Sequence, residues 1–334
     1  MSRTRPFETV VATTFYNQIS ANKRQSFLLA FVVAGILGLL GFAIGFALTG
    51  TPEGGLGATL IAVAIAGLTS IGSYMAGDKL VLATSKAIPV DEQTAPQLIN
   101  VVREMSIAAG VPMPKVYVIE DTAPNAFATG RDPEHASVAV TTGLLEKMDR
   151  EELQGVLAHE LSHVRNYDIR FTLLVGVLVG GVALLSDFFL RWTFWFGGGR
   201  SNDRDRGGGG LQAVFFILAI ILAIVAPIAA QLVRLAVNRQ REYLADASSV
   251  ELTRNPSGLE RALEKIATDK EVLEVASGAT QHMYFTNPIK KFEARARGLF
   301  STHPPIVERV NRLRQLTGQP PLDPNESAVL SGLD

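Results

Sequence analysis

One five-residue segment, His159-Glu160-Leu161-Ser162-His163, has the residue types and spacing of a metal site. Residues four apart lie on one face of an α-helix, so the two imidazoles can bind one cation while Glu160 lies beside it as a general base. Zinc in such a site keeps one coordination position open for water and lowers its pKa to about 7. The segment therefore predicts hydrolysis at one Zn²⁺ per chain, although such ligands also accept manganese or iron.

A catalytic zinc usually has three protein ligands, and the segment from Arg239 to Ala247 offers the third. Glu242 and Asp246 lie four residues apart there and share one face of a predicted helix. We expect Glu242 to complete the metal site and Asp246 to accept a hydrogen bond from a ligand imidazole, which fixes its tautomer. In the alternative interpretation, Glu242 forms a surface ion pair with Arg239 or Arg241.

The composition narrows the class of protein. Only 19% of the 334 residues are charged and the mean hydropathy is positive, which predicts that part of the chain lies in lipid. A formal net charge of -1 argues against nucleic acid as a partner, because phosphate binding requires a basic surplus. The chain has no cysteine, so disulfides and cysteine-bound zinc are excluded.

Four apolar segments are long enough to cross a bilayer, which takes about 20 residues. They comprise residues 27–49, 54–77, 171–190 and 211–233, and only the third contains a charged residue, Asp187. The first segment is too long for a cleavable signal and reads as a signal anchor. We therefore expect a multi-pass integral membrane protein with four transmembrane helices.

The charges around the first two apolar segments predict their orientation. Four basic residues precede the first segment, whereas its short connection to the second contains only Glu53. By the positive-inside rule, the N-terminus lies in the cytoplasm and the first hairpin returns the chain there. The connection from Arg191 to Gly210 is rich in arginine and would also prefer the cytoplasm. Four spans are nevertheless expected, with a shallow or re-entrant second hairpin as the alternative.

The apolar segments divide the chain into four parts. These are an N-terminal arm with the first hairpin (1–77), a first catalytic part (78–170), a second membrane or membrane-associated hairpin (171–236) and a second catalytic part (237–334). The two catalytic parts together have about 190 residues, enough for one core. Only residues 164–170 separate His163 from the third apolar segment, so the site is expected close to the membrane surface.

Local patterns predict the elements of the catalytic parts. We expect a helix over residues 94–109, ended by Gly110, and strands over 115–119 and 137–141. Asp149 and Glu152 form a capping box that begins the helix with the two histidines. Pro304 begins the last clear helix. The chain is therefore predicted to be a mainly α membrane protein with an α+β domain.

The chain resembles the HtpX family of membrane zinc proteases, which is related to the prenyl-protein endoproteases. The resemblance covers nearly the whole length and includes Pro-Asn-Ala-Phe-Ala-Thr-Gly-Arg at 124–131, Arg-Glu-Tyr-Leu-Ala-Asp at 241–246 and Ser-Thr-His-Pro-Pro at 301–305. It implies a gluzincin-type protease domain with a small sheet, located in a bacterial or archaeal plasma membrane with the active site facing the cytoplasm. It also implies a stress-response role in membrane protein quality control, with misfolded or damaged membrane proteins as the polypeptide substrates.

The resemblance also implies roles for individual residues. It places Asn125, Ala126, Phe127 and Ala128 in an edge strand that pairs with an extended substrate, and strand addition does bind many sequences through main-chain hydrogen bonds. His303 matches the family's downstream histidine, a candidate catalytic residue that stabilises the oxyanion or regulates access. In the alternative interpretation, His303 only caps a helix or packs. The sequence makes no prediction of oligomeric state.

Two other functional classes were weighed against this one. The first is an intramembrane protease of the site-two type, but Glu151, Glu152, Arg165, Asn166 and Asp168 make the surroundings of the motif too polar for the middle of a bilayer. The second is a non-catalytic membrane metal-binding scaffold. The intact general base argues against a scaffold, because metal binding alone does not require it.

Overall fold

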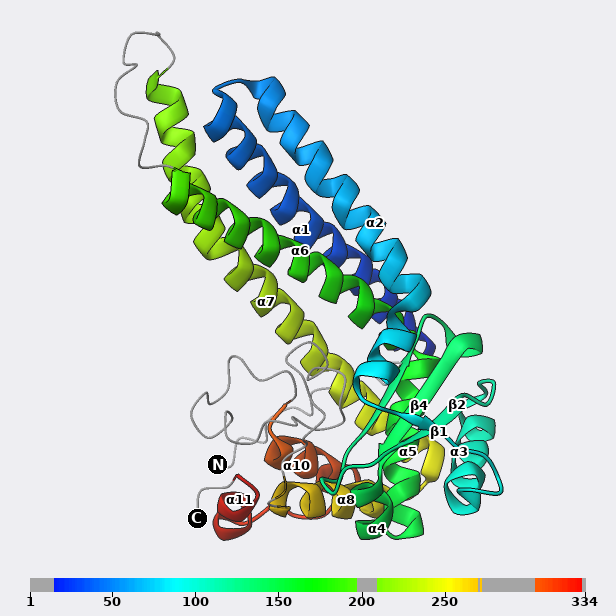
Figure 1. The fold of residues 1–334 in the computed structure, drawn as a ribbon. Coiled ribbons are helices and arrows are strands. Elements are labelled where there is room, and N and C mark those ends of the chain that lie inside the picture. The colour runs from blue at the N-terminus through cyan, green and yellow to red at the C-terminus, as the bar shows by residue number, and fades with distance from the viewer. Residues whose placement is uncertain (1–14, 197–208, 270, 272–303, 332–334) are drawn as a thin grey trace, which may run out of the picture.

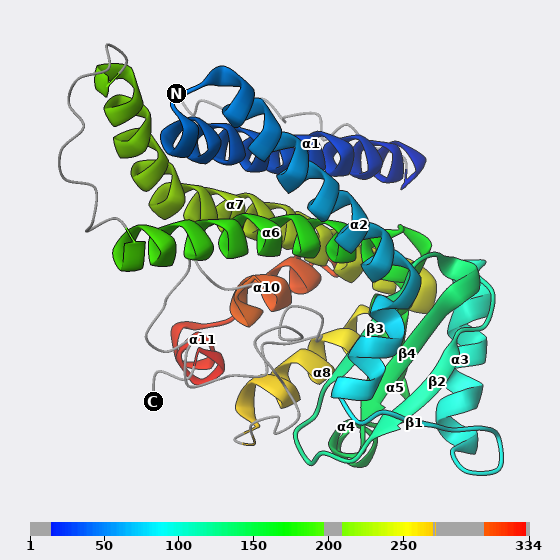
Figure 2. The same ribbon diagram turned by 45° about the horizontal axis from the view of Figure 1, so that its top comes forward.

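The computed structural model describes residues 15–196, 209–269, 271 and 304–331. Four long helices run together as a bundle, and a domain of shorter helices and one small sheet lies at one end of it (Figures 1 and 2). The elements are α1 (Phe15–Thr49), α2 (Pro52–Thr84), β1 (Ile88–Pro89), α3 (Pro96–Ala109), β2 (Lys115–Ile119), β3 (Ala126–Gly130), the 3₁₀ turn η1 (Pro133–His135), β4 (Ala136–Thr141), α4 (Thr142–Lys147), α5 (Arg150–Arg165), α6 (Asp168–Phe196), α7 (Gly209–Thr253), α8 (Pro256–Thr268), α10 (Ile306–Leu316) and α11 (Pro324–Leu330).

The bundle consists of α1, α2, α6 and α7. Three segments of the described helices are long and apolar enough to cross a membrane: Phe31–Thr49 in α1, Pro52–Thr69 in α2 and Gly210–Val233 in α7. Large apolar side chains such as Phe31, Leu60 and Ile61 face outward from the bundle, as expected for contact with lipid. The remaining predicted span, residues 171–190, lies in α6, which has 29 residues. That α6 crosses the bilayer stays a prediction.

Helix α6 ends and helix α7 begins at the end of the bundle away from the sheet (Figures 1 and 2). The beginning of α7 contacts the end of α1, where the Gln212 side chain donates a hydrogen bond to the Ala47 carbonyl at 3.1 Å.

The sheet is mixed, with the strand order β1-β2-β4-β3. Strands β2 and β4 are parallel, and β3 is antiparallel to β4 and forms one edge, with Ala128 opposite Val138. One face of the sheet contributes to the main core of the domain together with α3, α5 and α8, and this core includes Val138 and Leu157. The other face packs against the end of α2, where Phe127 is fully buried. The expected strands at 115–119 and 137–141 are confirmed.

The predicted helix boundaries follow from their capping residues. Asp149 and Glu152 make both hydrogen bonds of a capping box at the beginning of α5, as expected. Gly110 ends α3 in the left-handed conformation, at φ 66°, which glycine adopts without steric cost. The last predicted helix, α10, begins at Ile306 rather than Pro304 because Pro305 is its N-cap. These capping residues determine where α3, α5 and α10 begin or end.

Helix α7 joins the bundle to the domain without a break. Its 45 residues span about 68 Å at 1.5 Å per residue. The boundary drawn at residue 236 therefore lies inside one continuous helix. Because a change from apolar to polar side chains does not interrupt the backbone hydrogen bonds, hydropathy marks the end of a span and not of a helix.

Candidate active site

Helix α5 supplies three of the predicted site residues from the centre of the domain. His159 and Glu160 are buried, at 0% and 2% exposure, and His163 follows one turn later. One turn before His159, α7 contacts α5 through a hydrogen bond. The Ser249 hydroxyl of α7 donates to the Gly155 carbonyl at 2.7 Å. Helix α8 approaches the same glycine so closely that an added Cβ would lie 2.7 Å from the backbone nitrogen of Leu259. The motif is therefore carried by a rigid element.

Helix α7 brings Glu242 to the two histidines. One ligand atom from each of His159, His163 and Glu242 lies within 4.8 Å of the others. The two Nε2 atoms are 3.2 Å apart, and each is 3.5 Å from an oxygen of Glu242. Ligands of a tetrahedral zinc lie about 3.3 Å apart when each bond is about 2.0–2.1 Å. The three side chains therefore fit a zinc ion.

The remaining ring nitrogen of each histidine contacts a carboxylate. His159 Nδ1 lies 3.0 Å from Asp246 Oδ1, in the role expected for Asp246. His163 Nδ1 lies 3.1 Å from Asp168 Oδ2, a contact that the sequence did not predict. If each histidine is neutral and directs its Nδ1 proton at this carboxylate, its Nε2 lone pair points into the space beside Glu242 and is available to a metal ion.

Arg309 of α10 is a second site residue that the sequence did not predict. Its side chain is fully buried and donates to both oxygens of Asp246, at 2.9 and 2.7 Å. Burial alone would raise the pKa of Asp246, but the guanidinium charge overcomes this effect and holds that pKa below its usual value. The sequence contained one sign of this role, a charged residue on an otherwise apolar helix face. Arg309 shares the buried face of α10 with Val310 and Leu313.

The charge of the site also suits a divalent cation. The described buried groups around the ligands comprise four carboxylates, Glu160, Glu242, Asp246 and Asp168, and two guanidinium groups, Arg309 and Arg241. With neutral imidazoles and ionised carboxylates, these groups leave two uncompensated negative charges. Uncompensated buried charge is strongly unfavourable, so an ion of charge +2 would stabilise the site. Glu242 is 8% exposed and faces the imidazoles, which favours the ligand role over a surface ion pair.

Glu160 lies between the histidines and the edge strand. Burial raises the pKa of its carboxyl group, and a positive charge on the His159 or His163 imidazole opposes this rise. The backbone N–H of Ala128 in β3 hydrogen-bonds the same carboxylate. The predicted general base is therefore adjacent to the strand that was predicted to bind substrate.

The predicted substrate segment, Asn125 to Ala128, lies at the beginning of β3. Asn125 precedes the strand, and all five strand residues are buried. Thr141 holds the preceding loop, because its hydroxyl accepts from the Asn125 N–H at 2.9 Å and donates to the Ala123 carbonyl at 2.7 Å. Nothing in this arrangement tests substrate binding, which stays a prediction.

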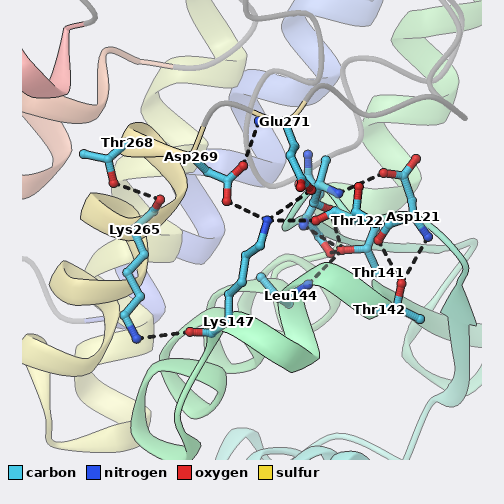
Figure 3. Close-up of polar contacts among 12 residues, drawn as sticks. Asp121, Thr122, Thr141, Thr142, Leu144, Lys147, Lys265, Thr268, Asp269 and Glu271 are labelled. Atoms are coloured by element: carbon cyan, nitrogen blue, oxygen red, sulfur yellow. Dashed lines mark hydrogen bonds and ion pairs between the residues drawn. The ribbon is translucent and has the colours of Figure 1, made fainter.

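Lys147 fixes the same loop to the end of α8. Figure 3 shows its ammonium group contacting Asp269, Glu271 and the Thr122 carbonyl, at 2.7, 3.1 and 2.9 Å. These contacts connect the loop before β3 to the chain that follows α8. His303, the other predicted catalytic residue, lies outside the described residues, so its role also stays a prediction.

The chain is similar to known proteins in both sequence and structure. Residues 92–317 match Peptidase family M48. A "Protease HtpX homolog" of Streptococcus gordonii is 46% identical over 304 residues, which cover 90% of this chain and 99% of the relative. The protein of the same name from Ligilactobacillus salivarius is 42% identical over 301 residues, with the same coverage.

A structural likeness is also present. The crystal structure of S. mikatae Ste24p matches with a TM-score of 0.50 and 18% sequence identity, covering 89% of this chain and 66% of that chain. At this identity the likeness concerns the fold alone.

Proposed function

The chain belongs to peptidase family M48, among the HtpX-type metallopeptidases, and on that premise we propose that it is a zinc endopeptidase embedded in a membrane. Its substrates are misfolded or damaged membrane proteins, cleaved at the cytoplasmic face. The observation that carries this proposal is the convergence of His159, His163 and Glu242. Zinc is favoured because the spacing of the ligand atoms suits tetrahedral coordination.

The reaction is peptide-bond hydrolysis with Glu160 as the general base. When bound, zinc supplies a Lewis acid that polarises a carbonyl and makes water more acidic. Glu160 takes a proton from the attacking water and later delivers it to the leaving amine. Its burial suits this role, because a carboxylate with little solvent around it is a stronger base than one in water.

Substrate binding by strand addition is the second part of the proposal. Strand β3 is an edge of the described sheet, and an extended peptide would pair with its outer side along residues 125–128. The hydrogen bond from the Ala128 N–H to Glu160 supports this geometry, because it puts the general base beside this strand. Main-chain pairing would accept many sequences, as disposal of damaged proteins requires.

The position of the site supports substrates close to the membrane. Glu242 follows the candidate span that ends at Val233 by nine residues of one helix, a rise of about 13 Å. Asp168, which contacts His163, is the first residue of α6. The four basic residues before the first apolar segment, 27–49, support a cytoplasmic orientation. Juxtamembrane or partly extracted segments are therefore the proposed cleavage sites.

Two alternatives make different predictions about cleavage. An intramembrane protease would cut within the apolar segment of its substrate, but α5 packs in the domain core outside the helical bundle, which favours cutting outside the bilayer. A non-catalytic scaffold would bind zinc without cutting. The buried Glu160, which is not among the three ligands, favours an enzyme.

The test uses the full chain in liposomes with a model substrate that has one membrane span and an unfolded tail. Mass spectrometry then locates the cuts before zinc removal, after chelation and after zinc is restored. We expect zinc-dependent cuts in the tail within a few residues of the span. Cuts inside the span would support the intramembrane alternative, and zinc binding without any cut would support the scaffold.

A further inference from the structure

The second predicted ligand, His163, has its own carboxylate and arginine partners. Asp168 Oδ2 lies 3.1 Å from His163 Nδ1, and both residues are largely buried. Arg241 Nε lies 3.4 Å from Asp168 Oδ1, and Arg241 Nη1 donates to the Asp168 backbone carbonyl at 3.4 Å. The Asp168 and Arg241 side chains are 4% and 5% exposed. This buried ion pair places the positive charge of Arg241 beside the Asp168 carboxylate.

The backbone turn between α5 and α6 brings Asp168 to this position. Helix α5 ends at Arg165, and the N–H of its C-cap Asn166 donates to the Ser162 carbonyl at 2.9 Å. Tyr167 then adopts the left-handed conformation at φ 61°. This conformation is costly for a residue with a bulky side chain and persists only where the surroundings enforce it. The turn changes the direction of the chain, so Asp168 begins α6 beside an imidazole five residues earlier.

The arrangement repeats the one around the first ligand. His159 contacts Asp246, which Arg309 holds, and His163 contacts Asp168, which Arg241 holds. A carboxylate on the far nitrogen of a ligand histidine fixes the ring orientation and makes the metal-binding nitrogen more basic. The two residues around His163 come from different helices. Asp168 is the first residue of α6, and Arg241 precedes Glu242 on α7.

We propose that Asp168 is a positioning residue for His163 and that Arg241 holds its carboxylate in place. The inference rests on the proposed zinc site. A helix-starting role alone would require only a carboxylate near the N-terminus of α6, which interacts favourably with the helix dipole. Asp168 makes more contacts than that role requires. One of its oxygens contacts the imidazole of a proposed ligand, and the other contacts a buried guanidinium group. The two helices that enter the bundle therefore orient one metal ligand.

The test measures zinc affinity of the detergent-solubilised full chain by competition with a chromophoric chelator. Asp168→Asn is expected to weaken zinc binding by about 10- to 100-fold and to change the absorption spectrum of the cobalt-substituted protein. Excess zinc should restore kcat for casein without a change in KM. Glu152→Gln is the matched control, because Glu152 is 1% exposed and paired with Lys265 but lies at the far end of α5. It should lower thermal stability and leave zinc affinity unchanged.

Equal zinc affinity in Asp168→Asn and the parent protein would overturn the inference, and so would an equal loss in the Glu152→Gln control. If circular dichroism shows that Asp168→Asn does not fold, Arg241→Gln is used in its place. This variant keeps the Asp168 carboxylate but removes the guanidinium group beside it. That variant should also bind zinc more weakly, and unchanged affinity would again overturn the inference. Failure of the parent protein to bind zinc would instead refute the proposed metal site.

Discussion

Replacement of Arg309 by methionine is expected to lower the free energy of unfolding by about 3–5 kcal/mol, because it leaves one buried partner of an ion pair without the other. Arg309 is fully buried, and both of its hydrogen bonds to Asp246 would be lost while the Asp246 carboxylate stayed 4% exposed. Methionine is flexible and fills much of the same space, which limits the part of the loss that comes from an empty cavity. The control is Arg150→Met, which removes a surface ion pair with Glu104 and should cost at most about 1 kcal/mol.

The assay is thermal unfolding of the zinc-free, detergent-solubilised protein, followed by circular dichroism. For a unit of 150–250 residues, 3–5 kcal/mol corresponds to a fall in Tm of about 6–20 °C. The pKa of Asp246 is held below its usual value in the folded state, so its contribution is present above about pH 3.9 and is lost as the pH falls through the folded-state pKa. The difference between parent and variant should therefore shrink in acid. A Tm within the range of the Arg150→Met control would refute the reasoning.

Three further predictions concern the elements around the site. Thr141→Val removes the hydroxyl that accepts from the Asn125 N–H and should raise KM for casein by about fivefold, the equivalent of one buried hydrogen bond, with little change in kcat and with recovery in Thr141→Ser. Asp149→Ala should cost about 1 kcal/mol in thermal unfolding at pH 7; because the Glu152 backbone N–H lowers the pKa of Asp149, the cost should disappear only as the pH falls below about 4. Gly155→Ala should cost about 1–3 kcal/mol, since its Cβ would lie 2.7 Å from the Leu259 nitrogen; an unchanged Tm would show that α5 and α8 are less tightly packed.

The features of the site that depend on local spacing were predictable from the sequence. Two histidines four residues apart require only a helix, and the capping box at Asp149 predicted that helix independently. The pair Glu242 and Asp246 followed the same rule on α7. Sequence spacing cannot predict that α5 and α7, about 80 residues apart at these positions, come into contact. Only the number of protein ligands that zinc requires pointed to Glu242.

The features that depend on turns and tertiary packing were not predictable. Asp168 reaches His163 only because Tyr167 adopts a positive φ, and no residue type in that turn demands this conformation. Arg309 was missed for a different reason. A charged residue on the apolar face of α10 breaks the expected pattern, and its meaning appears only when Asp246 is found opposite it.

The central claim is that Glu160 is the general base of a zinc endopeptidase, and Glu160→Gln tests it most directly. The measurement compares casein cleavage and zinc content of the parent protein, Glu160→Gln and the control Glu151→Gln, whose side chain is 58% exposed on the same helix. We predict that all three bind one zinc ion and that only Glu160→Gln fails to cleave. Cleavage by zinc-loaded Glu160→Gln at the rate of the parent protein would contradict the account.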